Sequence, residues 1–545
     1  MRLLSLVVAA MLFAGCATTA ATTKPSHALG KPSRADRAAV AEIRTEAEAL
    51  LRGQAELFWQ AWTTGAPVNV EALYAAHGGV FDVELLWSLH RVRNAERDAE
   101  AKRTLTFLEN WLAGELLARA TAEQSTQLAT LEASATFTVD GEPHDWRELE
   151  PMLAGESDPE RRAAIQQAAL PVLRQLGEVL AARRGRLEQA AKDGGYRSAL
   201  HAAAALRGSE PAAIDRLAAD VLDATDPLYA HAFGSMTRTQ LGLELAEMQR
   251  ADVPRLFAGP GFLARFPEAG AQAALAATLQ ELGLSADAIR METKAPSGRP
   301  LAFAVAPPAD VRLALPATAR DWAPVFREAG AALHAAHAEA GPFEHTMLGN
   351  EATAEAFAVL FENLTTDPAW LREHTGKTAA EASAHAAGAG VKRLYLARRH
   401  AGRLAFQVAW AEGKEKPRTL YRRSMERAYG FRLGATDTAW YAVDQDEWLY
   451  GADTLRAWIL AAMLEEHFVA KYGEAWWQSA EAGKELAALW SRGNRDTPEE
   501  VARRIGAKRL DPKALARQLQ GRLGAILPAS QPASAPSTAE SKPAT

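Results

Sequence analysis

The chain has 545 residues, a formal net charge of −6 at pH 7 and a single cysteine. Acidic and basic residues are interleaved along it, which argues against a nucleic-acid-binding surface. One cysteine excludes a disulfide framework. After the first 16 residues, no apolar run approaches the roughly 20 residues that a membrane span requires.

Residues 1–16 predict a lipoprotein signal peptide. An apolar stretch from Leu3 to Phe13 is followed by Ala14-Gly15-Cys16, and it is too short to span a membrane as a mature helix. A bacterial lipobox places the cysteine that is lipidated directly after such small residues, so Cys16 is the predicted lipid anchor. A plain signal peptide that happens to contain a cysteine is the alternative. Ala17, rather than aspartate, follows, which favours the outer membrane of the cell envelope, facing the periplasm.

The remaining chain divides into three parts by composition. Residues 17–35 are rich in Thr, Ala, Ser, Pro and Lys, as expected for a flexible tether. Residues 528–545 are rich in Pro, Ala, Ser and Thr, which predicts a disordered tail. Between them, 36–527 carries repeated amphipathic helical patterns with no internal linker. We therefore expect one mainly α-helical body with two lobes.

Two short segments of this body break the helical period. Residues 135–142 alternate in polarity and contain Asp-Gly, which predicts a hairpin. Residues 301–306 and 311–315 are apolar and flank Pro307-Pro308, so a second β-hairpin element is expected near 299–316. This element either forms part of a binding surface or only closes the lobe.

The segment 325–364 carries the most specific motif. It predicts two Ala-rich helices separated by Gly341-Pro342. The first has the form of the zinc-peptidase helix His-Glu-x-x-His, in which two imidazoles one turn apart bind the metal and the glutamate acts as base. Here Arg327 and Ala331 stand at the two imidazole positions, whereas Glu328 keeps the position of the base.

This segment resembles oligopeptidases of the thimet and oligoendopeptidase F type and, more distantly, angiotensin-converting enzyme. Those families carry Phe-His-Glu-x-Gly-His-x-x-His, and residues 326–334 match it except at the two ligands. A second helix supplies their third ligand, at the position of Glu355. The resemblance, clearest over 295–515, implies a two-lobed helical fold around a central cleft, a peptide-bond hydrolase activity and zinc as cofactor.

A second motif, Trp448–Trp458, also departs from the family. The family places a tyrosine just before Leu-Arg-Ala-Trp, with its hydroxyl aimed at the oxyanion that forms on the scissile carbonyl. Thr454 fills that position here and is too short for the same reach. Tyr450 could substitute only if the helix were displaced by about one turn.

These substitutions predict that the zinc site is lost. Catalytic zinc needs three protein ligands and an open position for water, and only Glu355 remains. We expect Arg327 to take the place of the metal as a structural charge that pairs with Glu355 or Glu328. The sequence thus favours a catalytically inactive pseudopeptidase that binds peptides or an envelope protein in its cleft.

Two alternatives stay open. A rebuilt metal site could use His334, His345 and Glu351, with zinc as cofactor and peptide hydrolysis as the activity. The body could instead be a purely structural envelope lipoprotein with a filled cleft. A serine nucleophile is unsupported, because the chain has no Gly-x-Ser-x-Gly motif.

Overall fold

The computed structural model describes residues 30–262, 266–293, 295–413, 415–524 and 526. The predictions for the signal peptide, Cys16, most of the tether and the C-terminal tail lie outside the described residues. The described chain is mainly α-helical with two small sheets, which confirms the predicted fold class. Over the described residues, no helix combines the length with the apolarity that crossing a membrane demands.

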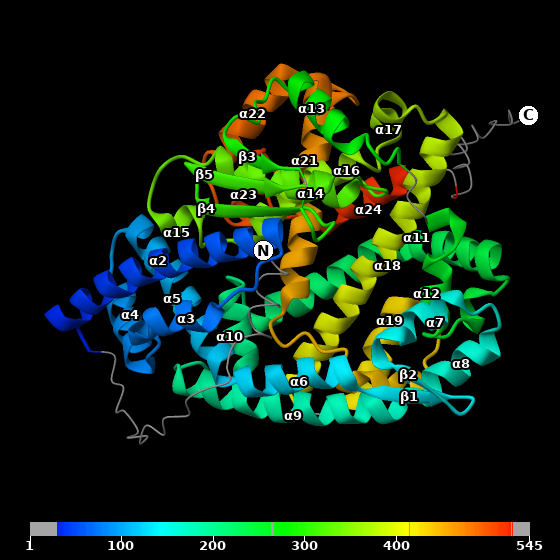
Figure 1. The fold of residues 1–545 in the computed structure, drawn as a ribbon, viewed down its shortest axis with the longest axis horizontal. Coiled ribbons are helices and arrows are strands. Elements are labelled where there is room, and N and C mark those ends of the chain that lie inside the picture. The colour runs from blue at the N-terminus through cyan, green and yellow to red at the C-terminus, as the bar shows by residue number, and fades with distance from the viewer. Residues whose placement is uncertain (1–29, 263–265, 294, 414, 525, 527–545) are drawn as a thin grey trace, which may run out of the picture.

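The N-terminal helices form one end of the molecule (Figure 1). The first begins after Ser33, whose hydroxyl accepts from the amide of Asp36 at 3.0 Å while the Asp36 carboxylate accepts from the amide of Ser33 at 2.7 Å. This reciprocal cap satisfies two otherwise unpaired amides. The four helices are α2 (Arg34–Thr64), α3 (Val70–Ala76), α4 (Val83–Ala95) and α5 (Ala99–Ala120).

The next segment makes up the lower part of the molecule in Figure 1. The predicted hairpin is present: its strands pair antiparallel, and both Asp140 and Gly141 of the turn have positive φ. Its elements are α6 (Ala122–Ser134), β1 (Thr136–Val139), β2 (Glu142–Asp145), α7 (Leu149–Gly155), α8 (Pro159–Ala168), α9 (Leu170–Asp193), α10 (Ala199–Leu206), α11 (Pro211–Leu241) and α12 (Asp252–Phe257).

The second predicted strand pair is also present but belongs to a three-stranded sheet. β4 (Leu301–Ala306) pairs antiparallel with β5 (Asp310–Ala314), and β3 (Ile289–Glu292) pairs parallel with the other side of β5. The sequence prediction missed β3, because three of its four residues are exposed and it shows no alternation. β4 is thereby an edge strand. Helix α13 (Ala271–Glu281) precedes the sheet.

The C-terminal half contains the two predicted motif helices, α14 and α16. In Figure 1, α18 and α21 run from the upper part of the molecule into the lower part. The helices are α14 (Ala323–Ala336), α15 (Phe343–Thr346), α16 (Glu351–Leu364), α17 (Pro368–Thr375), α18 (Ala379–Ala411), α19 (Pro417–Tyr429), α20 (Ala435–Thr438), α21 (Tyr450–Tyr472), α22 (Ala480–Trp490), α23 (Pro498–Arg504) and α24 (Pro512–Arg522). Short 3-10 turns are η1 (Gly78–Val80), η2 (Trp146–Glu148), η3 (Leu245–Glu247), η4 (Pro260–Phe262), η5 (Ala439–Ala442) and η6 (Trp476–Gln478).

Close contact between α14 and α16 depends on Gly330. A Cβ atom at this position would lie 2.9 Å from the carbonyl oxygen of Phe357 and 3.0 Å from the Cβ of Phe361. A larger residue would therefore push the helices apart. The glycine of the motif thus has a packing role that does not require a metal.

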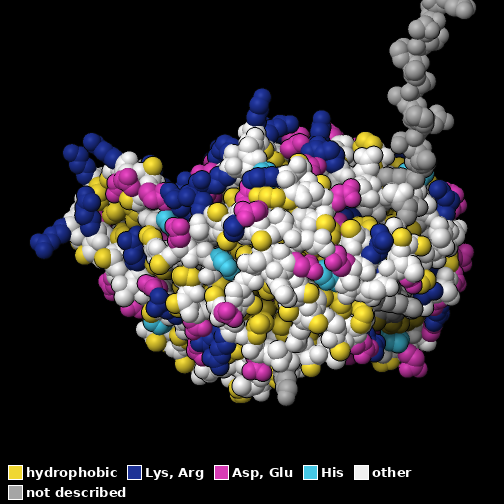
Figure 2. Space-filling view, turned by 90° about the horizontal axis from the view of Figure 1, so that it is seen from above, with side chains coloured by type: hydrophobic (Ala, Val, Ile, Leu, Met, Phe, Trp, Pro, Cys, Tyr) yellow, Lys and Arg dark blue, Asp and Glu magenta, His cyan; other side chains and the backbone are white. Residues whose placement is uncertain are grey.

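The surface carries both signs of charge. On the face drawn in Figure 2, Lys and Arg side chains are interspersed with Asp and Glu, as the interleaved sequence predicts.

Candidate functional site

Arg327 lies between α14 and α16 and is paired with two glutamates. Its guanidinium contacts the carboxylate of Glu355, and its Nη1 donates to Oε2 of Glu362 at 2.9 Å. Arg393 of α18 donates from Nη2 to the other oxygen of Glu362 at 2.5 Å. The Arg327 side chain is 27% exposed and those of Glu355 and Glu362 are 16% and 18% exposed. We call these four residues the Arg327 cluster.

The charges of the Arg327 cluster balance, with two guanidiniums facing two carboxylates. Burial alone would lower the pKa of Arg327, but Glu355 and Glu362 outweigh it, so the pKa lies above its usual range. The guanidinium is therefore a fixed cation that offsets the negative charge of two largely desolvated carboxylates.

The sequence predicted that Arg327 pairs with Glu355 or Glu328, and the structure pairs it with Glu355. Adjacent residues on a helix point about 100° apart, and Glu328 is directed to the sheet, where its Oε2 accepts from the amide of Ala302 at 2.9 Å. The partner that sequence reasoning missed is Glu362. It follows Glu355 by two helical turns and so lies on the same face of α16, which is the signal that was available.

The Glu328 carboxylate accepts a hydrogen bond from a backbone amide on the edge of the sheet that pairs with no other strand. The Ala302 amide that it engages belongs to edge strand β4, on the side away from β5. Burial raises the pKa of the Glu328 carboxyl. A raised pKa suits a general base, but the side chains around Glu328 do not supply the ligands that zinc needs. Arg327 and Ala331 offer no lone pair for the metal, so Glu355 is the sole ligating side chain at the three expected positions.

His334 is fully enclosed beside α16. It is 2% exposed, its ring stacks on Phe357 with centroids 5.0 Å apart, and its Nε2 lies 3.1 Å from the carbonyl oxygen of Gly493. Burial lowers its pKa to about 4. The ring is therefore neutral at pH 7 and donates its Nε2–H to the carbonyl, which leaves this nitrogen unable to ligate a metal.

The other residues suggested for a rebuilt metal site lie with different partners. Nε2 of His345 is 3.3 Å from the carboxylate of Glu100, and Glu351 pairs with Arg207 at 3.2 Å. The structure does not bring His334, His345 and Glu351 together. Across the described ranges, no group of three or more His, Cys, Asp or Glu side chains is arranged to hold a metal ion.

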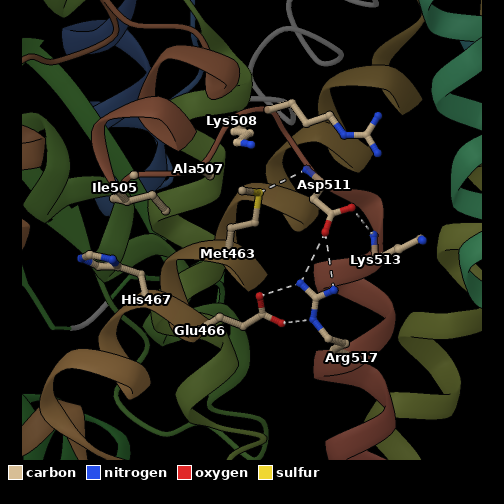
Figure 3. Close-up of a pocket in the computed structure, with 11 residues that line it drawn as sticks. Met463, Glu466, His467, Ile505, Ala507, Lys508, Asp511, Lys513 and Arg517 are labelled. Atoms are coloured by element: carbon tan, nitrogen blue, oxygen red, sulfur yellow. Dashed lines mark hydrogen bonds and ion pairs between the residues drawn. The ribbon is translucent and has the colours of Figure 1, made fainter.

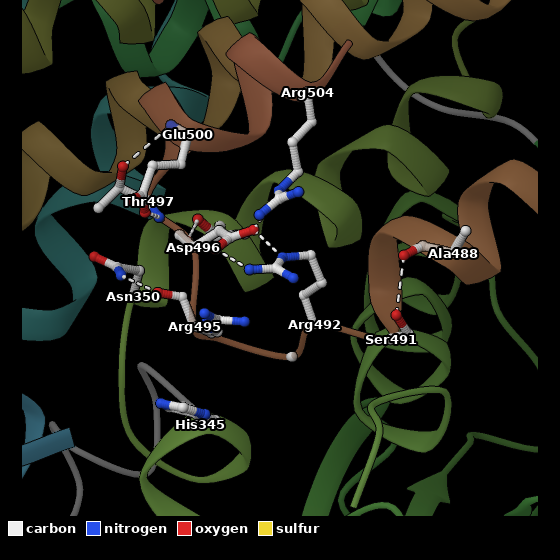
Figure 4. A network of polar contacts seen from close by, with 12 residues as sticks. His345, Asn350, Ala488, Ser491, Arg492, Arg495, Asp496, Thr497, Glu500 and Arg504 are labelled. Atoms are coloured by element: carbon white, nitrogen blue, oxygen red, sulfur yellow. Dashed lines mark hydrogen bonds and ion pairs between the residues drawn. The ribbon is translucent and has the colours of Figure 1, made fainter. Parts of the chain in front are cut away.

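A loop over 491–497 is hydrogen-bonded to both segments, the one that carries His334 and the one that carries His345. Figure 4 shows this loop beside His345. The amide of Asn494 donates to the carbonyl of His345 at 2.7 Å, and the amide of Asn350 donates to the carbonyl of Asn494 at 2.9 Å. The loop is fixed in turn by Asp496, which accepts from Arg492 at 2.9 Å and from Arg504 at 2.6 Å. Backbone hydrogen bonds and ion pairs thus hold this loop in place.

In the second motif, the Thr454 hydroxyl is hydrogen-bonded within its own helix. Thr454 is buried, and its Oγ1 donates to the carbonyl of Tyr450, one turn earlier on α21, at 3.0 Å. The Tyr450 ring lies 4.7 Å from the guanidinium of Arg207. Arg207, which sequence reasoning did not single out, also donates to the buried carboxylate of Asp453 at 2.6 Å.

A cavity of about 590 Å³ lies elsewhere, between α21 and α24 (Figure 3). One of its cations, Arg517, is already bound by Glu466 at 2.7 Å and by Asp511. None of the predicted site residues lines it.

No protein-family model matches the chain, and no curated protein matches it. Among solved structures, the fold is similar to that of a candidate peptidase from Chlamydophila abortus, with a TM-score of 0.64 and 14% identity over 89% of both chains. It is also similar to a candidate oligoendopeptidase F from Bacillus anthracis strain Ames, with a TM-score of 0.58 and 14% identity over 93% of this chain and 99% of that one. At this identity the similarity establishes a peptidase-like fold.

Proposed function

We propose that the protein is a catalytically inactive member of the oligopeptidase group that binds peptides, or an extended segment of an envelope protein, in the periplasm. The observation that carries the proposal is the Arg327 cluster. A cation stands where the first zinc ligand is expected, it is paired with the glutamate expected as the third ligand, and a methyl group stands at the second position. Loss of the ligands supports loss of hydrolysis, and the peptidase-like fold supports peptide binding.

Edge strand β4 supports the binding half of this proposal. An exposed strand edge is a common way to hold an extended peptide, because its backbone groups are ready to pair with another strand. Glu328 already accepts from the Ala302 amide on that edge. The backbone of a bound peptide would therefore pair with the residues of β4 that follow Ala302. The Glu328 side chain then acts as an anchor for the strand rather than as a base.

The proposed location is the bacterial cell envelope, with a lipid anchor at Cys16 in the outer membrane. The sequence of the first 17 residues supports it. Labelling cells with a radioactive fatty acid, followed by purification of the protein, tests the anchor. Label in the natural chain and none in Cys16→Ser is the expected result, whereas label retained in Cys16→Ser would refute it.

The test of inactivity compares three forms of the full chain, purified in detergent with added zinc. The natural chain and Glu328→Gln are expected to contain no stoichiometric zinc by elemental analysis and to leave a mixed peptide library intact. The double variant Arg327→His, Ala331→His restores both imidazole positions beside Glu355 and is expected to acquire one zinc per chain. Stoichiometric zinc in the natural chain, with cleavage that Glu328→Gln abolishes, would overturn the proposal in favour of an active peptidase.

A further inference from the structure

A second group of charges surrounds Asp444, farther along the helix that supplies Arg393. Arg399 and Arg403 of α18 both contact Oδ1 of this carboxylate, at 2.6 Å and 3.1 Å. The hydroxyl of Tyr421 donates to Oδ2 at 3.0 Å. Asp444 is 4% exposed, whereas solvent reaches both arginine side chains, which are 27% and 18% exposed. The carboxylate is thus enclosed, whereas solvent reaches the two arginine side chains that contact it.

Arg250 adds a third guanidinium to this group. It lies 3.4 Å from the centroid of the Trp440 ring, interacts electrostatically with Asp444 and is half-buried. Within the described part of the chain, no hydrogen-bond acceptor meets its Nε. Three cations therefore surround Asp444.

The other carboxylates beside Arg250 already have partners. Asp252 is paired with Arg162 at 2.7 Å, and Asp437 accepts from Gln166 at 2.7 Å. Arg162 neutralises Asp252, whereas Asp437 faces a neutral amide and interacts electrostatically with Arg250. Three guanidiniums therefore face two carboxylates, Asp444 and Asp437, and one positive charge remains in excess.

Two aromatic donors near these cations also have no acceptor among the described residues. They are the hydroxyl of Tyr429, whose side chain is completely buried, and Nε1 of Trp440. Tyr429 interacts electrostatically with Arg250 and with Arg399. Buried donors without an acceptor are rare in native proteins because each has lost its water. Unpaired donors beside excess positive charge point to an acceptor that is negatively charged.

The arrangement fits a carboxylate in particular. A guanidinium presents a planar fork of N–H groups that matches the two oxygens of a carboxylate. Arg399 and Arg403 both engage a single oxygen of Asp444, Oδ1, and Tyr421 engages the other. Nε of Arg250 and the hydroxyl of Tyr429 remain as donors for a second carboxylate.

The distance along α18 matches a bound peptide. Arg399 and Arg403 follow Arg393 by six and ten residues, which corresponds to about 9 Å and about 15 Å of helix. An extended peptide advances about 3.3 Å per residue. Arg399 and Arg403 also lie about 120° and 80° around the helix from Arg393. A peptide that starts beside the Arg327 cluster would therefore reach these arginines after about three to five residues only if it also winds partly around α18.

We propose that Arg250, Arg399 and Arg403, together with Tyr429, form a carboxylate-binding subsite that selects acidic peptides. This subsite rests on the proposed peptide-binding function. Its ligand is the carboxylate of an Asp or Glu side chain or of a peptide C-terminus, since both present the same two oxygens.

The first experiment measures the binding of labelled alanine-based octapeptides to the full chain by fluorescence anisotropy. One probe carries a single internal Glu and a C-terminal amide, the second replaces Glu by Gln, and the third has Gln with a free C-terminal carboxylate. An acidic probe is expected to bind at least about tenfold more tightly than the neutral one. The probe that shows the preference identifies whether the side chain or the terminus is bound.

The second experiment tests the subsite without a peptide. Binding of capped glutamate and capped glutamine (N-acetylated α-amides) is followed by ligand-observed NMR, and only the first is expected to bind. Arg250→Gln and Tyr429→Phe should each remove most of the preference for the acidic ligand. Arg238→Gln, which alters an exposed arginine paired with Glu244, is the matched control and should keep it.

Tyr429→Phe also separates a binding role from a structural one. Because the hydroxyl meets no acceptor among the described residues, its removal should leave the urea midpoint unchanged or raise it. A lower midpoint would show that the hydroxyl supports the fold and would count against the subsite.

The outcomes distinguish the two proposals. Equal binding of all three octapeptides, with no binding of capped glutamate, refutes the subsite and leaves peptide binding in place. Binding of capped glutamate without binding of any octapeptide supports the subsite and refutes the proposed function. Binding of neither refutes both.

Discussion

Replacing Arg327 by alanine tests whether this residue holds the two motif helices together by charge. The variant removes the guanidinium that is paired with Glu355, while Glu362 keeps its contact with Arg393. Removing one partner of a fully buried ion pair costs about 3–5 kcal/mol. The three side chains are between 16% and 27% exposed, so screening by water reduces this penalty. We expect a loss of about 2 kcal/mol in the free energy of unfolding at pH 7.5.

Urea unfolding followed by circular dichroism measures these free energies in a double-mutant cycle. Glu355→Gln removes the charge that has lost its contact with Arg327, so adding it to Arg327→Ala should restore part of the lost stability. Arg320→Ala is the matched control, because Arg320 is 86% exposed and should change the free energy by less than about 0.5 kcal/mol. Strictly additive effects of the two substitutions, or an Arg327→Ala variant as stable as the natural chain, would refute the reasoning.

Three further predictions concern packing, a buried histidine and the loop that ties the motif helices. Gly330→Ala should cost about 1–3 kcal/mol in the urea assay because its Cβ meets α16, whereas Gly114→Ala, with nothing within 4 Å, should be neutral or stabilising. His334 has a pKa of about 4 in the folded protein, below its unfolded value. Its contribution to the free energy of unfolding is therefore present above pH 6.5 and is lost as the pH falls towards 4. Acid should destabilise the natural chain by up to roughly 3 kcal/mol more than it destabilises His334→Gln. Asp496→Asn should lower the urea midpoint by weakening the contacts of Arg492 and Arg504, and equal midpoints would contradict the role assigned to the loop.

The sequence was sufficient for features that depend on residues close together in the chain. The positions of Arg327, Glu328 and Ala331 on one helix follow from spacing alone, as do the hairpin at 135–142 and the strand pair near 299–316. Local backbone preference and the period of apolar residues decide such elements. β3 escaped prediction because its place in the sheet depends on β5 rather than on its own pattern.

What surrounds each motif residue was decided by the tertiary structure. Arg327 meets Glu362 rather than Glu328, because helix rotation sends Glu328 to the sheet while α16 presents two glutamates on one face. Arg393 joins them from a third helix. The sequence by itself determined that a guanidinium and a methyl group stand at two expected ligand positions. Only the packing of three helices determined which carboxylates that guanidinium neutralises, because a charge on one helix acquires its partners from segments distant in sequence.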